Sequence, residues 1–175
     1  KAVIYGDLLQ KMLTKNRVYE VNKGETQKLY DEWMQKCKEL VVHSSLSEFK
    51  KSIYDMVNDF EKIELDTSMK KPKVGIVGEV LIKYHPFGNN FIAEKLEQEG
   101  AEVILPDFMG FVKFMATHKI TFNTLIKTDK YKAKIFKLAI KLIDILEKDE
   151  RIALANSKKG YLQPCDIWEL EDKVK

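Results

Sequence analysis

The sequence predicts an α/β fold: a partial, doubly wound parallel sheet flanked by helices, with a helical segment before it. Two short apolar runs predict strands, Val74–Val77 after Pro72 and Val103–Leu105. Between them, the pattern predicts a helix over Phe91–Glu99 that ends at Gly100. Strand–helix–strand units with short connections form right-handed parallel crossovers. We therefore expect the two strands to be neighbours in one sheet.

Three helices are expected before this unit. Apolar residues recur at helical spacing within residues 2–15, 25–40 and 45–62. Thr26 is the expected N-cap of the second helix, and Ser45 or Ser47 that of the third. A polar, lysine-rich stretch over residues 65–73 is the expected boundary. Residues 1–65 are thus predicted to form a helical segment and residues 73–175 an α/β lobe, which together can form one compact domain.

The second half of the chain is expected to continue this lobe. Residues 108–115 form a strongly apolar turn or helix, whereas residues 116–129 show no clear pattern. Residues 131–147 predict the longest helix, whose expected buried face is Ile135, Leu138, Ala139, Leu142, Ile143 and Leu146. Phe136, Ile140 and Ile145 widen that face, which predicts burial on more than one side. The tail, residues 154–175, predicts a turn at Lys159-Gly160, an extended stretch and a last helical turn around Trp168.

The composition indicates which kinds of partner and which cellular compartment to expect. Lysine and arginine number 30 against 27 acidic residues and are interspersed with them, which is typical of a solvated surface and not of a nucleic-acid interface. No apolar run is long enough to span a membrane, so no membrane partner is expected. Two isolated cysteines fit a reducing cytoplasm. The first residue, Lys1, is not an initiator Met, which favours a piece of a longer chain.

The loop after the first strand holds most of the candidate site residues, because binding groups collect at the carboxyl ends of parallel strands. The candidates for ligand binding or docking are Glu79, Lys83, Tyr84, His85, Asn89, Asn90 and, after the second strand, Asp107. Together they offer groups for binding a carboxylate, a phosphate or a partner surface. The alternative is structural. Glu79 and Lys83 would pair, His85 would pack before Pro86, and the asparagines and Asp107 would cap helices.

No catalytic or metal-binding motif is present. Gly75–Glu79 resembles the start of a phosphate-binding turn, but it lacks G-x-G-x-x-G and G-K-[ST], so a plain tight turn is the alternative. Cys37 lies on an apolar helical stripe and is expected to be a buried thiol, whereas Cys165 is the better placed of the two for ligation. No C-x-x-C, H-x-x-x-H or nucleophile elbow occurs.

Three stretches resemble one known family. They are KPKVGIVGEVLIKYHPFGNNFIAEKLEQEGAEVILPD at residues 71–107, NRVYEVNKGETQKLYDEWMQKC at residues 16–37 and FKKSIYDMVNDFEKI at residues 49–63. They are similar to the dehydratase-like region of CoA-substrate-specific enzyme activase-type proteins, which are related to the activators of 2-hydroxyacyl-CoA dehydratases. The resemblance covers most of residues 1–115.

The resemblance implies both a fold and a function. Such proteins join ATPase modules to a dehydratase-like region of flavodoxin-like (Rossmann-like) lobes with an iron–sulfur cluster, and they pass electrons to a dehydratase at the expense of ATP. This chain would be one non-catalytic lobe that contributes to a cluster- or CoA-thioester-binding crevice. Its partners would be other domains of the parent chain or a dehydratase subunit. The iron–sulfur cluster and ATP are expected in the full-length protein rather than in this fragment.

Two other functions stay open at this point. One is a self-contained nucleotide- or small-molecule-binding domain, with Gly75–Glu79 and the helix near Asn90 as its anion site. The other is a protein-docking module in which Lys83–His85 forms the docking loop.

Overall fold

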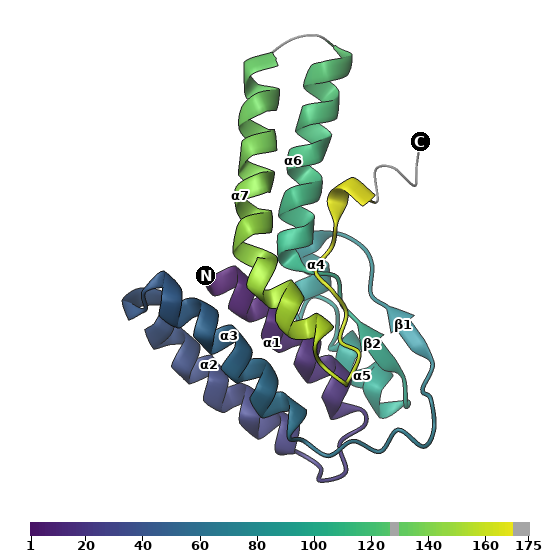
Figure 1. Ribbon diagram of the computed structural model, residues 1–175. Coiled ribbons are helices and arrows are strands. Elements are labelled where there is room, and N and C mark those ends of the chain that lie inside the picture. Colours follow the sequence, from purple (N-terminus) through teal and green to yellow (C-terminus); the bar gives the residue numbers. More distant parts are fainter. Residues whose placement is uncertain (127–129, 170–175) are drawn as a thin grey trace.

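The computed structural model describes residues 1–126 and 130–169, and its architecture is mostly helical (Figure 1). In chain order the elements are α1 (Ala2–Arg17), α2 (Glu25–His43), α3 (Leu46–Glu61), β1 (Lys73–Gly75), α4 (Val80–Tyr84), α5 (Ile92–Gln98), β2 (Glu102–Ile104), α6 (Phe108–Leu125) and α7 (Lys130–Ala155). No helix in the described residues is both long and apolar enough to cross a membrane.

The main core lies between α1, α2, α3 and the end of α7. Many of its side chains are ones whose helical spacing predicts burial, including Leu8 and Met12 of α1 and Phe49 and Phe60 of α3, whereas Tyr161, from the segment after α7, is not expected there. Cys37 is 4% exposed within this core, which confirms the prediction of a buried thiol. α1 is central, because it also packs against β2, α6 and α7.

The N-terminus of α2 differs from the prediction. Gly24, in the left-handed region with φ of 89°, is the N-cap residue, so the prediction of Thr26 is wrong. The carboxylate of Glu20 folds back and accepts hydrogen bonds from the backbone N–H groups of Gly24 (2.7 Å) and Thr26 (2.8 Å). An acidic side chain from the preceding connector therefore replaces the expected local cap.

The N-cap of α3 is Ser45, as predicted. Its hydroxyl accepts from the Glu48 N–H at 3.2 Å, and the Glu48 carboxylate accepts from the Ser45 N–H at 2.7 Å. This is a complete capping box, which satisfies two backbone donors at once.

Replacing Ser45 by Ala is expected to lower the free energy of unfolding by about 1 kcal/mol, because one helix N–H loses its acceptor. Urea denaturation followed by circular dichroism measures this loss. Ser47→Ala, two residues further along and equally exposed, is the matched control and should change stability by less than about 0.5 kcal/mol. Equal effects of the two variants would contradict the role of the cap.

The predicted strand–helix–strand unit is present. β1 and β2 pair in parallel, with Val74 opposite Val103, and α5 lies between them in sequence. Gly100 follows α5 with φ of 86°, as the predicted glycine stop requires.

The predicted flavodoxin- or Rossmann-like lobe is wrong. The described sheet has only these two strands, and helices make up most of the chain. After Asp107 no further β-branched run bounded by turn residues occurs, and the chain forms two long helices where further strands would be needed.

Those helices, α6 and α7, form an antiparallel hairpin that rises away from the rest of the molecule (Figure 1). α6 includes both the predicted apolar turn or helix, residues 108–115, and most of residues 116–129, which show no clear pattern in the sequence. Residues 127–129 lie outside the described residues. The buried stripe of α7 contains Ala133 and Ile140, whereas Leu138 and Leu142, expected on its buried face, are exposed.

After α7 the chain turns at Gly160, runs extended and forms a helical turn at residues 167–169. This agrees with the predicted tail as far as residue 169, and the rest of that prediction lies outside the described residues.

Candidate functional site

A group of charged side chains is buried where α1, α6, α7 and the extended segment after α7 meet. Lys11 of α1 lies 3.0 Å from Asp107 and 2.9 Å from Glu150 of α7. Burial lowers the pKa of Lys11, but the charges of Glu150 and Asp107 raise it by more, so its pKa is above the ordinary value. Burial also raises the pKa of Glu150 to about 7.

A second buried cation holds the extended segment in place. Lys113 of α6 lies 2.7 Å from the Glu147 carboxylate and donates to the backbone carbonyl of Cys165 at 2.6 Å. Arg151 donates to the same carbonyl at 3.1 Å and to that of Pro164 at 2.9 Å. These charges bind one another and the backbone, so they fix the position of the tail, and this arrangement is that of a structural network.

Asp107, a predicted site residue, belongs to this network. It precedes α6, but its side chain does not cap that helix. It accepts from the Cys165 N–H at 2.9 Å instead. Asp7 of α1 provides the cap, because its two oxygens accept from the N–H groups of Phe108 (2.9 Å) and Met109 (2.8 Å).

The other predicted site residues all lie between β1 and α5, on the short helix α4 and the loops on either side of it. Glu79 caps α4, accepting from the backbone N–H groups of Leu81 and Ile82. Lys83 Nζ lies 4.8 Å from the centroid of the Tyr84 ring, and the Tyr84 hydroxyl donates to the Pro106 carbonyl. Burial is the main cause that raises the pKa of Tyr84. Tyr84 thus ties α4 to the end of β2.

The remaining loop residues stabilise the turn before α5. His85 Nδ1 accepts from the Gly88 N–H at 3.0 Å. Asn89 accepts from the Ile92 N–H at 3.3 Å and donates to the Lys83 carbonyl at 3.2 Å. Asn90 adopts a left-handed conformation with φ of 58°. His85 and Asn89 thus bind the loop itself, as the structural alternative expects, whereas no ion pair between Glu79 and Lys83 is seen among the described residues; whether the loop binds a ligand stays a prediction.

The Gly75–Glu79 turn contains one position that needs glycine. Gly78 has φ of 138°, which side-chain-bearing residues rarely adopt. This conformation accounts for the glycine as part of a tight turn after β1.

The residues present do not fit an iron–sulfur cluster. Such clusters take about four thiolates, and the chain has two cysteines. Burial raises the pKa of Cys37 to about 12 and also raises that of Cys165, which disfavours the thiolate that a metal needs. In the part of the chain that the structure describes, no group of three or more His, Cys, Asp or Glu side chains could hold a metal ion.

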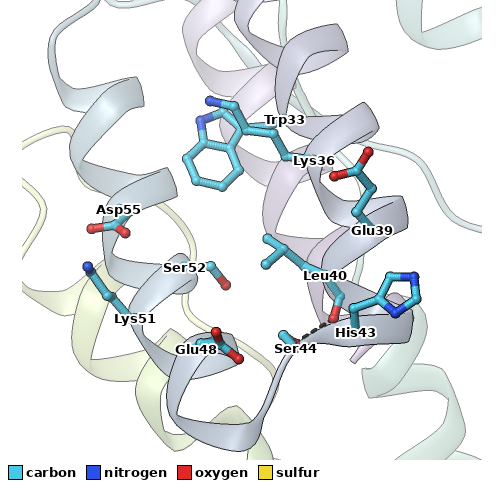
Figure 2. Close-up of a pocket in the computed structure, with 10 residues that line it drawn as sticks. All are labelled: Trp33, Lys36, Glu39, Leu40, His43, Ser44, Glu48, Lys51, Ser52 and Asp55. Atoms are coloured by element: carbon cyan, nitrogen blue, oxygen red, sulfur yellow. Dashed lines mark hydrogen bonds between the residues drawn. The ribbon is translucent and has the colours of Figure 1, made fainter.

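An open groove of about 490 Å³ runs between α2 and α3 (Figure 2). It is lined by Trp33, Lys36, Glu39, Leu40, His43, Ser44, Glu48, Lys51, Ser52 and Asp55. The Trp33 indole N–H donates to Asp59 at 3.2 Å, and Lys36 Nζ lies 4.6 Å from the Trp33 ring centroid. The lining carries both charge signs and includes Trp33 and Leu40 of the apolar stripe of α2. Sequence reasoning missed the groove because it depends on how α2 packs against α3, which no local pattern shows.

Both helices of the α6–α7 hairpin carry large apolar side chains that are exposed to solvent. They include Phe114, Met115, Phe122, Leu125, Ile135, Leu138, Leu142 and Ile145. The hairpin's own core is small, with Ile120 of α6 and Ala133 and Ile140 of α7 at its centre. The hairpin therefore buries only part of its apolar surface within the described chain.

No family model, curated protein or solved structure matches this chain.

Proposed function

We propose that this chain is a non-catalytic docking lobe that holds a partner protein on the α6–α7 hairpin. The observation that carries the proposal is the exposed apolar surface of both helices. Many large apolar side chains exposed on one helical hairpin are unusual for a surface that faces only water, and such surfaces mark interaction sites.

The charge of the hairpin indicates the chemistry of the partner. Over residues 108–155, ten lysines and arginines stand against five acidic residues, whereas the whole chain has a net charge of +3. Four of those acidic residues lie within residues 144–150, so the hairpin is basic, most strongly so before Asp144. A partner surface with carboxylates around apolar side chains is complementary to it.

The resemblance to activase-type proteins supports a partner from the 2-hydroxyacyl-CoA dehydratase system. In that case the chain is a lobe of an activase-related protein, and the hairpin docks a dehydratase subunit beside the cluster- or CoA-thioester-binding crevice of the larger assembly. ATP and the iron–sulfur cluster are then bound elsewhere in that assembly.

Binding of the purified chain to an immobilised 2-hydroxyacyl-CoA dehydratase tests this function. We expect a complex with a Kd of about 1–10 µM that weakens several-fold when salt rises from about 0.05 to 0.5 M, because the lysines contribute to the attraction. Docking would be overturned if no complex with the dehydratase forms and CoA or ATP instead raises the melting temperature. If Lys83→Ala abolishes that increase, the ligand site lies on the loop.

A further inference from the structure

One face of α7 carries a regular stripe of exposed side chains, which we call the α7 seam: Ile135, Leu138, Leu142 and Ile145. Their exposed fractions range from 49% to 64%. They follow one another at intervals of three, four and three residues, which is the a/d spacing of a coiled coil. Ala139 and Leu146, at the neighbouring e positions, are exposed as well. An a/d stripe with apolar e positions is the surface that a packed helix covers.

α7 also has a second apolar stripe, which α6 covers. Ala133 and Ile140 are buried and pack with Ile120 of α6 inside the hairpin. α7 thus has one apolar stripe covered by a helix of its own chain and another, the α7 seam, that the described residues leave exposed.

The α7 seam continues an existing helix–helix contact. The position after Ile145 in the same spacing is Asp149, which accepts from the Tyr54 hydroxyl at 3.3 Å and pairs with Lys50 at 3.4 Å. Tyr54 and Lys50 both belong to α3, which packs along the lower part of α7. α3 therefore contacts this side of α7 at Asp149, and the α7 seam extends from there toward the tip of the hairpin.

The g positions along one edge of the α7 seam are all lysines. Lys134, Lys141 and Lys148 occupy the position before each a residue, where coiled coils place the charges that select their partners. All three are exposed. A second copy of the chain would bring further lysines to this surface, so self-association is disfavoured. Glutamate or aspartate on an incoming helix would pair with them.

We propose that the α7 seam binds one amphipathic helix of the partner protein, with apolar residues at its a and d positions and Glu or Asp at the flanking e and g positions. This rests on the proposed docking function and names the part of the partner that docks. The heptad spacing of the α7 seam, with a lysine before each a position, favours a helix over a membrane surface, and binding to lipid is therefore one of the outcomes that the test below distinguishes.

A designed peptide tests the α7 seam without the natural partner. The peptide is about three heptads long, with Ile at a, Leu at d and Glu at e and g, and its own glutamates keep it monomeric. The matched control peptide has Lys in place of each Glu. By fluorescence anisotropy with the full chain, we expect the Glu peptide to bind with a Kd of about 10 µM or tighter, and the Lys peptide to bind at least ~30-fold more weakly.

Two pairs of variants locate the site on the chain. Leu138→Gln combined with Leu142→Gln removes half of the α7 seam at positions that are already exposed, so the fold should be kept; we expect at least ~10-fold weaker binding of the Glu peptide. Leu81→Gln, on an exposed residue of α4, is the control and should leave the Kd unchanged. Lys134→Glu combined with Lys141→Glu should weaken binding of the Glu peptide and strengthen binding of the Lys peptide. Lys28→Glu on α2 should change neither Kd.

The outcomes separate this proposal from the one on which it rests. Peptide binding that follows the two seam variants supports the α7 seam. No peptide binding, or binding unaffected by those variants, overturns it, while a dehydratase complex that survives the same variants leaves the docking function standing. Self-association of the chain that the Leu138 and Leu142 variants abolish, or binding to vesicles of anionic lipid in place of the peptide, would also overturn it.

Discussion

Glu147→Ala is expected to lower the free energy of unfolding by about 3–5 kcal/mol, the largest effect of any single substitution considered for this protein. Glu147 is 1% exposed, and the side chain of its partner Lys113 is 0% exposed. Removing the carboxylate leaves a buried ammonium group whose other acidic neighbour, Asp144, is 3.4 Å away and partly exposed. Arg151 also loses its contact with Glu147 at 3.2 Å.

Urea denaturation of the purified chain measures this effect, and two further variants separate charge from volume. Glu147→Gln keeps the shape and an acceptor oxygen, so its loss should be intermediate. Lys113→Met combined with Glu147→Leu removes both charges and fills the space; it should fall within about 2 kcal/mol of the unchanged protein, because no buried charge is left unpaired. If Glu147→Ala costs less than about 1 kcal/mol, or if the double variant is the least stable of the three, the network does not hold the tail as described.

Much of the helical part of this fold can be predicted from the sequence. α1, α2 and α3 each carry an apolar stripe long enough to define the period, and Ser45 with Glu48 marks a boundary by a purely local interaction. The parallel pairing of β1 and β2 is also predictable, because a short apolar run lies on each side of α5. Local signals are sufficient wherever the deciding contacts are close in sequence.

The error in fold class has a physical cause. One strand–helix–strand unit is compatible both with a large sheet and with a two-stranded one, and the difference depends on the residues after Asp107. There the apolar residues are so frequent that helical period and general burial are difficult to tell apart. The exposed stripe of α7 illustrates this, because the spacing of Leu138 and Leu142 is visible in the sequence while their exposure is not.

In the candidate site, too, contacts between sequence neighbours could be predicted and long-range contacts could not. The loop residues His85 and Asn89 lie together on the predicted loop, since they are neighbours in sequence. The buried network could not be predicted, because Lys11 and its partner Glu150 are separated by 139 positions. Nothing local distinguishes Lys11 from the many exposed lysines, and only the packing of α1 against α7 makes it a buried charge.

The same network predicts how stability depends on pH. Burial raises the pKa of Glu150 from 4.5 to about 7, with Lys11 opposing the shift. Between these two pH values the folded protein therefore holds a proton that the unfolded chain has released. Stability must then fall as the pH rises through this window. A shift of this size corresponds to at most about 3 kcal/mol, and burial raises the pKa of Asp7 and Glu97 in the same direction.

We accordingly expect the free energy of unfolding to be greater near pH 5 than near pH 8, by about 1–3 kcal/mol. Glu150→Gln cannot ionise, so its stability should change clearly less over the same range, while Glu39→Gln, on an exposed residue of α2, should change in parallel with the unchanged protein. Urea denaturation at several pH values gives the change of the free energy of unfolding with pH for each protein. Parallel slopes for the Glu150 variant and the unchanged protein would show that Glu150 is ionised throughout, and that Lys11 compensates fully for its burial.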